Sequence, residues 1–173
     1  MINGPTIVGC GTLGATLALN LAEKRLVSKL TIYDFDSVSL GSYPFEPCDV
    51  GVSKVKVLEF HCKKLNPDLN IIAHEKRVLQ PLNTNDFVID CRDCKRPSIN
   101  SSIRLSLDGH LLYIDSSKKY STSKNYHRYI YPKNPDFIET AVSNIINYLM
   151  NDEYSYHQLR LYNIKKSEQY NLK

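Results

Sequence analysis

A glycine-rich turn near the start of the chain carries the clearest chemical signal in the sequence. Gly9, Gly11 and Gly14 have the spacing G-x-G-x-x-G, and Thr12 and Leu13 lie between the last two glycines. Glycines let backbone N–H groups approach a phosphate closely, and the N-terminus of a following helix adds partial positive charge. These five residues therefore predict a binding site for nucleotide phosphates. The simpler alternative is a glycine turn that serves only helix packing.

A carboxylate follows the turn at the distance expected for a ribose contact. Asp34 ends the second apolar run, about twenty residues further on, where dinucleotide-binding folds place an acidic residue that accepts hydrogen bonds from ribose hydroxyls. Asp36 either supports Asp34 at the ribose or acts as an Asx-type turn residue. These residues alone suit NAD and ATP equally well.

The elements that must position these residues begin as a strand, a tight turn and a helix. Residues 6–8 are an apolar run stopped by glycines, and apolar residues then recur at helical spacing. Residues 30–33 predict a second strand, and residues 35–52 a long loop of the kind that is usually functional. Ser53 is a good N-cap for a helix that ends at Asn66-Pro67.

Further apolar runs complete the expected sheet. Residues 70–74, 87–91 and 111–115 predict three more strands, and residues 98–107 predict a helix. Strands that alternate with helices are typical of a parallel sheet covered on both faces. We therefore expect an α/β fold in residues 1–117: a Rossmann-like, doubly wound, mainly parallel sheet with helices on both faces.

The composition changes after residue 117. Residues 118–126 are polar and serine-rich and predict a loop, and residues 126–131 predict an edge strand. Residues 136–149 predict an amphipathic helix, and a strand is expected near residues 159–164 before a polar tail. We therefore expect residues 118–173 to form a small C-terminal extension of one domain that comprises residues 1–173.

Composition and charge favour an ordinary globular protein. The chain has 173 residues, of which 42% are hydrophobic and 23% charged, which is enough for one sizeable core. It contains neither an apolar run of about 18 residues nor a signal-peptide pattern, so we expect a cytoplasmic protein without a membrane span. The net charge of +4 comes from residues 118–173, with 9 basic and 5 acidic side chains against 13 and 13 in residues 1–117. A surplus this modest is more typical of a solvated face than of nucleic-acid binding.

The cysteines indicate neither a disulfide framework nor a metal site. The chain has an odd number of cysteines and no secretion signal. The cysteines are Cys10, Cys48, Cys62, Cys91 and Cys94. Cys91 and Cys94 form one C-x-x-C pair, but no second pair supplies the other ligands of a structural zinc. We therefore expect reduced thiols and no zinc.

A longer pattern separates the candidate nucleotides. Residues 34–38 (DFDSV), residues 49–54 (DVGVSK), Asn66-Pro67 and residues 90–93 (DCRD) resemble, in order and spacing, the ThiF/MoeB and ubiquitin-activating-enzyme family. The resemblance runs from residue 7 to about residue 116. That family adenylates C-terminal carboxylates, so the resemblance implies ATP with Mg²⁺ as the ligand. It also implies a ubiquitin-like or other protein or peptide as the acceptor, and a homodimer or hetero-oligomer.

The resemblance assigns roles to three residues. Asp34 corresponds to the family's ribose-binding aspartate, Lys54 to its phosphate-binding lysine and Asp93 to an aspartate that helps to hold magnesium. Adenylation develops negative charge on the α-phosphate and the leaving pyrophosphate, which a point cation and a carboxylate-held Mg²⁺ stabilise. Lys54 and Asp93 are therefore the expected catalytic residues, and Asp93 the expected magnesium ligand.

Several family residues are replaced, which keeps other functions open. Members usually carry an Asn and an Arg in the long loop, where this chain has Ser42 and Phe45, and Cys94 replaces an Asn after the magnesium aspartate. Loss of the loop arginine removes a bidentate phosphate contact. A catalytically inert ThiF-fold scaffold, a pseudoenzyme that binds a protein partner, is therefore the first alternative. An NAD-binding oxidoreductase is the second, although the pattern in residues 49–54 weighs against it.

Overall fold

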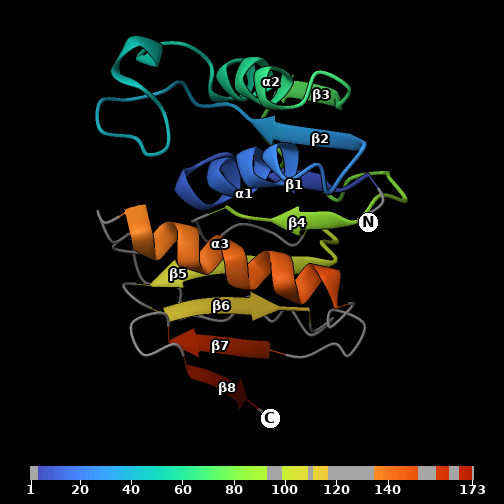
Figure 1. Ribbon diagram of the computed structural model, residues 1–173. Coiled ribbons are helices and arrows are strands. Elements are labelled where there is room, and N and C mark those ends of the chain that lie inside the picture. Colours follow the sequence, from blue (N-terminus) through green and yellow to red (C-terminus); the bar gives the residue numbers. More distant parts are fainter. Residues whose placement is uncertain are drawn as a thin grey trace.

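One eight-stranded sheet runs through the protein (Figure 1). The computed structural model describes residues 4–92, 99–108, 111–116, 135–151, 159–163 and 168–172. The strand order is β3-β2-β1-β4-β5-β6-β7-β8. The strands are β1 (Thr6–Val8), β2 (Lys29–Asp34), β3 (Asn70–Glu75), β4 (Val88–Asp90), β5 (Ile103–Asp108), β6 (Leu111–Asp115), β7 (Leu159–Asn163) and β8 (Glu168–Leu172).

The first five strands form a parallel sheet of Rossmann type. β1 is parallel to β2 on one side and to β4 on the other, and β3 and β5 extend the sheet outward in the same direction. The chain therefore reverses its direction of winding between β1 and β4. The expected α/β class and mainly parallel, Rossmann-like sheet are confirmed.

The described α-helices pack together on one face of this sheet, and a short 3-10 helix, η1 (Pro47–Asp49), lies in the long loop. The α-helices are α1 (Thr12–Glu23), α2 (Lys54–Leu65) and α3 (Pro135–Met150), with α1 in contact with both others (Figure 1). Helix α1 is buried on nearly every side, and most of its buried residues are leucine or alanine. The small alanine side chains let neighbouring helices approach it closely. None of the helices in the described part of the chain is long and apolar enough to cross a membrane.

The opposite face near β1 and β4 is covered by loop residues. Val8 and Val88 project there, since successive side chains of a strand alternate between faces, and they pack against Val78 and Ile99. Tyr33 adds partly buried contacts to the same small cluster. We expected helices on both faces, but in the described residues the helices cover one.

The helix predicted over residues 98–107 is wrong. Ile103, Leu105 and Leu107 are buried and alternate with Arg104 and Ser106, which is the period of a strand, and they form β5. β5 then pairs antiparallel with β6. The segment expected to form a helix is thus a strand that widens the sheet.

The C-terminal extension contributes both core and sheet. α3 confirms the helix predicted at residues 136–149, and β7 confirms the strand predicted near residues 159–164. β8 was not predicted, because Glu168–Leu172 is too polar to indicate a strand, yet it pairs antiparallel with β7. The apolar stripe of α3 is buried in the main core, so it is used within the chain. The edge strand predicted at residues 126–131 lies outside the described residues.

Candidate functional site

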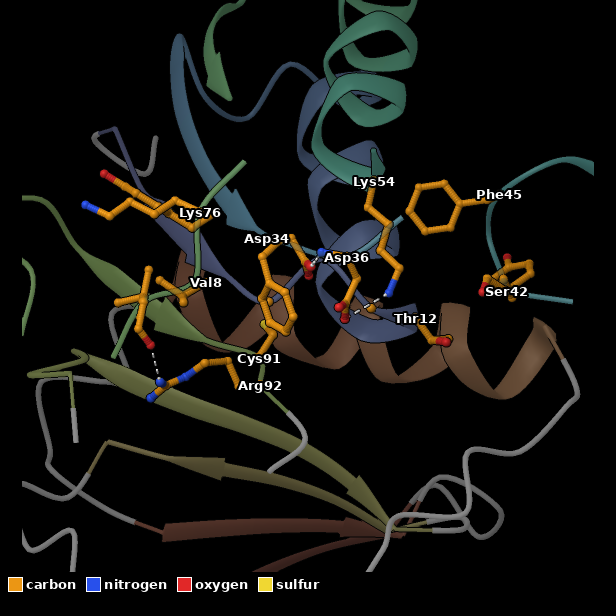
Figure 2. Close-up of a pocket in the computed structure, with 16 residues that line it drawn as sticks. Val8, Thr12, Asp34, Asp36, Ser42, Phe45, Lys54, Lys76, Cys91 and Arg92 are labelled. Carbon is orange, nitrogen blue, oxygen red and sulfur yellow. Dashed lines mark hydrogen bonds and ion pairs between the residues drawn. The ribbon is translucent and has the colours of Figure 1, made fainter. Parts of the chain in front are cut away.

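A cavity lies at the point where the sheet reverses its winding. Residues at the carboxyl ends of β1, β2 and β4 line it, and its volume is about 210 Å³ (Figure 2). In open α/β sheets, ligands bind in the crevice outside the carboxyl ends of the strands at this switch point. Its wall contains six of the predicted nucleotide-binding residues: Gly9, Gly11, Thr12, Asp34, Asp36 and Lys54.

The three glycines of the turn have different physical reasons to be glycine. Gly9 has φ of +95°, and a Cβ there would lie 2.9 Å from the backbone nitrogen of Arg92. At Gly14, a Cβ would overlap the carbonyl group of Gly9, so α1 can pack on β1 only without a side chain. At Gly11, in contrast, a Cβ would meet nothing within 4 Å. The chain's own packing therefore requires Gly9 and Gly14 but leaves open space over Gly11.

The N-terminus of α1 points its partial positive charge toward this space. Gly11 is the N-cap and makes no side-chain capping bond, and the first turn carries no acidic residue. Thr12 lines the cavity beside it, whereas the side chain of Leu13 is buried in the core. Helix N-termini of this kind favour anions. The predicted roles of Leu13 and Gly14 in binding would use their backbones, and they stay predictions.

Asp34 joins the glycine turn to the long loop. Its Oδ2 accepts a hydrogen bond from the backbone N–H of Cys10 at 2.6 Å, and its Oδ1 accepts one from the backbone N–H of Asp36 at 2.8 Å. The residue is 8% exposed and lines the cavity. Each oxygen of a carboxylate has two lone pairs, so Asp34 keeps acceptor capacity for ribose hydroxyls. The Asx-type turn considered for Asp36 is made by Asp34.

Lys54 faces the cavity next to Asp36. The ammonium nitrogen lies 3.7 Å from Oδ2 of Asp36, and the Lys54 side chain is only 15% exposed (Figure 2). The backbone N–H of Lys54 also donates to the carbonyl of Asp36 at 3.1 Å, which anchors the start of α2 to the loop. The structure thus brings the predicted phosphate lysine and the predicted ribose carboxylate to one cavity.

The long loop between β2 and α2 also forms part of the cavity wall. Ser42, Tyr43 and Phe45 line it, and Phe45 also packs against the main core. Figure 2 shows Ser42 and Phe45 on the same side as Lys54. The residues that replace the family's Asn and Arg therefore do face the candidate nucleotide site.

Two cations in the cavity wall were not predicted from the sequence. Lys76 follows β3, and its backbone N–H donates to the carbonyl of Asp34 at 2.9 Å. Arg92 follows β4 and donates from Nε and Nη2 to both oxygens of Asp90, each at 2.8 Å, and from Nη1 to the carbonyl of Val78. Both residues follow a predicted strand, and the carboxyl ends of parallel strands meet at one edge, so that position was the available signal.

The thiols near the cavity are shielded rather than activated. Burial raises the pKa of Cys10 well above its usual value, and the charge of Asp34 raises it further. Burial, followed by the charge of Asp90, likewise raises the pKa of Cys91. Because the thiolate is the nucleophile and metal ligand, neither residue is suited to thiol chemistry at neutral pH.

The magnesium prediction cannot be placed on the described residues. Asp93 and Cys94 lie outside them, and no group of three or more His, Cys, Asp or Glu in the described part of the chain is arranged to hold a metal ion. Asp34 and Asp36 are the described carboxylates in the cavity wall.

Comparisons with known proteins agree with this geometry. A model of the ThiF family matches residues 4–104. The chain is 29% identical over 128 residues to the adenylyltransferase and sulfurtransferase MOCS3 of Aedes aegypti, a match that covers 61% of this chain and 29% of that protein. It is 29% identical over 85 residues to ubiquitin-like modifier-activating enzyme 5 of Branchiostoma floridae, covering 47% of this chain and 21% of that protein. The chain therefore spans less than a third of the length of these curated relatives.

Solved structures share the fold. E. coli MccB, in a crystal structure with ATP, has a TM-score of 0.63 at 14% identity, with 98% of this chain and 63% of that chain covered. PaaA has a TM-score of 0.64 at 13% identity, with 100% of this chain and 64% of that chain covered.

Proposed function

Because the chain belongs to the ThiF family, we propose that it binds ATP with Mg²⁺ in the cavity over the glycine turn and adenylates a C-terminal carboxylate of a protein or peptide. The printed names of its relatives support this choice. MOCS3 is named an adenylyltransferase, a second relative is named an activating enzyme for a ubiquitin-like modifier, and MccB was crystallised with ATP and with MccA.

The observation that carries the proposal is the open space over Gly11. A Cβ at Gly11 would meet nothing within 4 Å, although Thr12, Asp34 and Lys54 surround the same cavity. Phosphates placed there would receive the N-terminus of α1 and the Lys54 ammonium, and the ribose would lie at Asp34. A bound phosphate would account for a glycine that internal packing does not require.

The proposed reaction transfers the adenylyl group. An oxygen of the acceptor carboxylate attacks the α-phosphorus, the bond from that phosphorus to the bridging oxygen breaks, and pyrophosphate leaves. Negative charge grows on the phosphate oxygens, where Lys54 and the N-terminus of α1 stabilise it. Bound Mg²⁺ would neutralise charge on the leaving pyrophosphate, and Asp93 is the residue predicted to hold it.

An inert scaffold is the second candidate, and the loop wall favours it. Ser42 and Phe45 line the cavity where the resemblance implies an amide and a guanidinium. Phe45 offers no hydrogen bond to a phosphate, so this side of the site lacks a bidentate contact. A scaffold would keep the fold for assembly with a protein partner, as a homodimer or hetero-oligomer, and would not exchange pyrophosphate.

Calorimetric titration with ATP and Mg²⁺ tests the binding step. We expect saturable binding that Lys54→Ala weakens by about tenfold or more, because a charge-assisted contact contributes about 1.5–3 kcal/mol. Lys56→Ala is the matched control, since Lys56 lies on the same helix, is well exposed and pairs with Glu75. Equal affinity in the two variants would contradict the role of Lys54, and no binding at millimolar ATP would contradict the proposal.

Pyrophosphate exchange then separates the two candidates. Exchange between pyrophosphate and ATP that depends on a peptide with a free C-terminus supports adenylation. Binding of ATP without any exchange across a panel of such peptides, together with copurification of a partner, supports the scaffold.

A further inference from the structure

A hydrogen-bonded triad links the loop wall of the cavity to both α1 and α3. We propose that Tyr43 and Glu139 are positioning residues of the nucleotide site: the Tyr43 hydroxyl, held by the Glu139 carboxylate, fixes residues 42–45 as a wall of the cavity. This inference rests on the proposed function for its ligand. Its structural part, the anchoring of the loop, can be measured without any ligand.

The triad joins three separate elements. The Tyr43 hydroxyl donates to Oε1 of Glu139 at 2.9 Å, across 96 positions of sequence. The Asn20 amide nitrogen donates to Oε2 of the same carboxylate at 3.1 Å, and to the carbonyl of Thr16 within α1. Glu139 thus accepts from the loop with one oxygen and from α1 with the other, so its side chain has one preferred orientation.

Burial strengthens the contacts of this triad. Asn20 is only 9% exposed, and Glu139 is partly buried between α1 and the loop. Hydrogen bonds to an ionised group in such surroundings are stronger than bonds at an open surface, and loss of one partner leaves a polar group unsatisfied.

The Tyr43 hydroxyl stays protonated and can therefore always donate its hydrogen bond to Glu139. Burial, the hydrogen bond to Glu139 and the charges of Glu139 and Asp136 raise the pKa of Tyr43 to about 12. The hydroxyl therefore keeps its proton throughout the neutral pH range, and the contact does not act as a pH switch.

The position of Tyr43 is transmitted to its neighbours in the wall. Ser42 precedes it and shares a hydrogen bond of 2.7 Å with the hydroxyl of Ser39, and the backbone N–H of Phe45 donates to the carbonyl of Ser42 at 2.9 Å. Ser42, Tyr43 and Phe45 all line the cavity. Movement of Tyr43 would therefore move the whole wall and change the width of the site.

Glu139, which anchors the loop, lies outside the part of the chain that the family model matches. That match ends at residue 104, and α3 begins at Pro135. The loop that lacks the family's phosphate contacts is thus held by a helix of the C-terminal extension. The extension is, on this view, a component of the site and not only a cover for the sheet.

Variants of the triad test the inference in two measurements. Hydrogen exchange in the free protein reports on the Ser42 and Phe45 amides, and calorimetry reports the Kd for ATP with Mg²⁺. We expect Tyr43→Phe and Glu139→Ala to speed exchange of these amides by about tenfold and to weaken ATP binding by about fivefold, as loss of one hydrogen bond predicts. Glu139→Ala also removes the hydrogen bond from Asn20. The double variant should therefore show the same changes as Glu139→Ala alone, because the bond between Tyr43 and Glu139 is already absent in that single variant.

Conservative and control variants distinguish positioning from general stability. Glu139→Gln keeps an oxygen that can accept from Tyr43, so part of the loop protection should return. Tyr148→Phe removes a 2.9 Å hydrogen bond between α3 and Ser116, away from the loop, and should lower Tm without changing exchange at Ser42 or Phe45.

Each other result has a definite meaning. Unchanged exchange at Ser42 and Phe45 in Tyr43→Phe would overturn the anchor, and faster exchange with an unchanged Kd would overturn positioning. If the wild-type protein binds no ATP, the proposed function fails and positioning of a nucleotide wall fails with it, whereas the exchange data still decide whether the anchor exists.

Discussion

The glycine turn and the loop of residues 42–45 line the same cavity, but internal packing constrains their residues in different ways. On the side of the glycine turn, Gly9 and Gly14 are required by close backbone contacts, and Gly11 borders open space. On the loop side, Ser42 and Phe45 stand where the resembled family has phosphate ligands, and Phe45 contributes to the core. One side leaves open space for a ligand, while the other includes a side chain that packs against the core.

The difference shows how much a glycine motif says about a ligand. Two of its three glycines would be retained in any chain with this packing of α1 on β1, whether or not a nucleotide binds, because a Cβ at either position would collide with backbone. Only Gly11 lacks such a reason. The ligand argument therefore depends on one glycine and on the charged groups near it, not on the whole motif.

The largest effect should come from Gly14→Ala. The added methyl group would overlap the Gly9 carbonyl and force α1 away from β1. We expect a loss of about 3 kcal/mol in the free energy of unfolding and a fall in Tm of about 10 °C. Thermal unfolding followed by circular dichroism measures this change, and an unchanged Tm would break the distinction between Gly14 and Gly11.

Gly11→Ala should show the reverse pattern. Space for the methyl group is available, so the cost in stability should stay within about 1 kcal/mol, the usual range for an N-cap change. The same methyl group would occupy the phosphate position, and we expect ATP affinity to fall about 30-fold, or about 2 kcal/mol. Calorimetry on the folded variant measures the affinity. Wild-type affinity in Gly11→Ala would mean that the phosphates lie elsewhere.

The smallest expected effect is a gain. Phe45→Arg would place a cation on the loop side, where a charge-assisted contact to a phosphate contributes about 1.5 kcal/mol, or roughly tenfold in Kd for ATP. Phe45→Leu is the control, because it keeps an apolar side chain and should not increase affinity. If both variants bind ATP equally, the cation is irrelevant, and the comparison between the two sides loses its chemical basis.

Local patterns allowed much of the fold to be predicted. The first four strands, the helices that became α1, α2 and α3, and the strands β6 and β7 were all recognised from apolar periodicity. β5 was missed because some of its residues are also good helix formers. The tertiary structure shows its strand alternation, since Ile103, Leu105 and Leu107 are all buried in the core. β8 was missed because its strand state depends on pairing with β7.

The candidate site was predicted in part. Asp34 and Lys54 do line one cavity, as the resemblance implied, whereas Lys76 and Arg92 were not singled out. Nothing in the local sequence of Lys76 distinguishes it from other lysines. Its place at the cavity follows from the position of β3 beside β2, which is a property of the sheet.

The sequence by itself determined most of the strands and helices, the G-x-G-x-x-G turn and the carboxylate that follows it, because periodicity and turn chemistry act over a few residues. The tertiary structure decided which glycine leaves space for a ligand and that Glu139 holds Tyr43. Contacts between residues 96 positions apart depend on how the sheet winds and how helices stack on it, and no local pattern encodes that arrangement. For this reason the glycine turn could be recognised in the sequence, but the contact between Tyr43 and Glu139 could not.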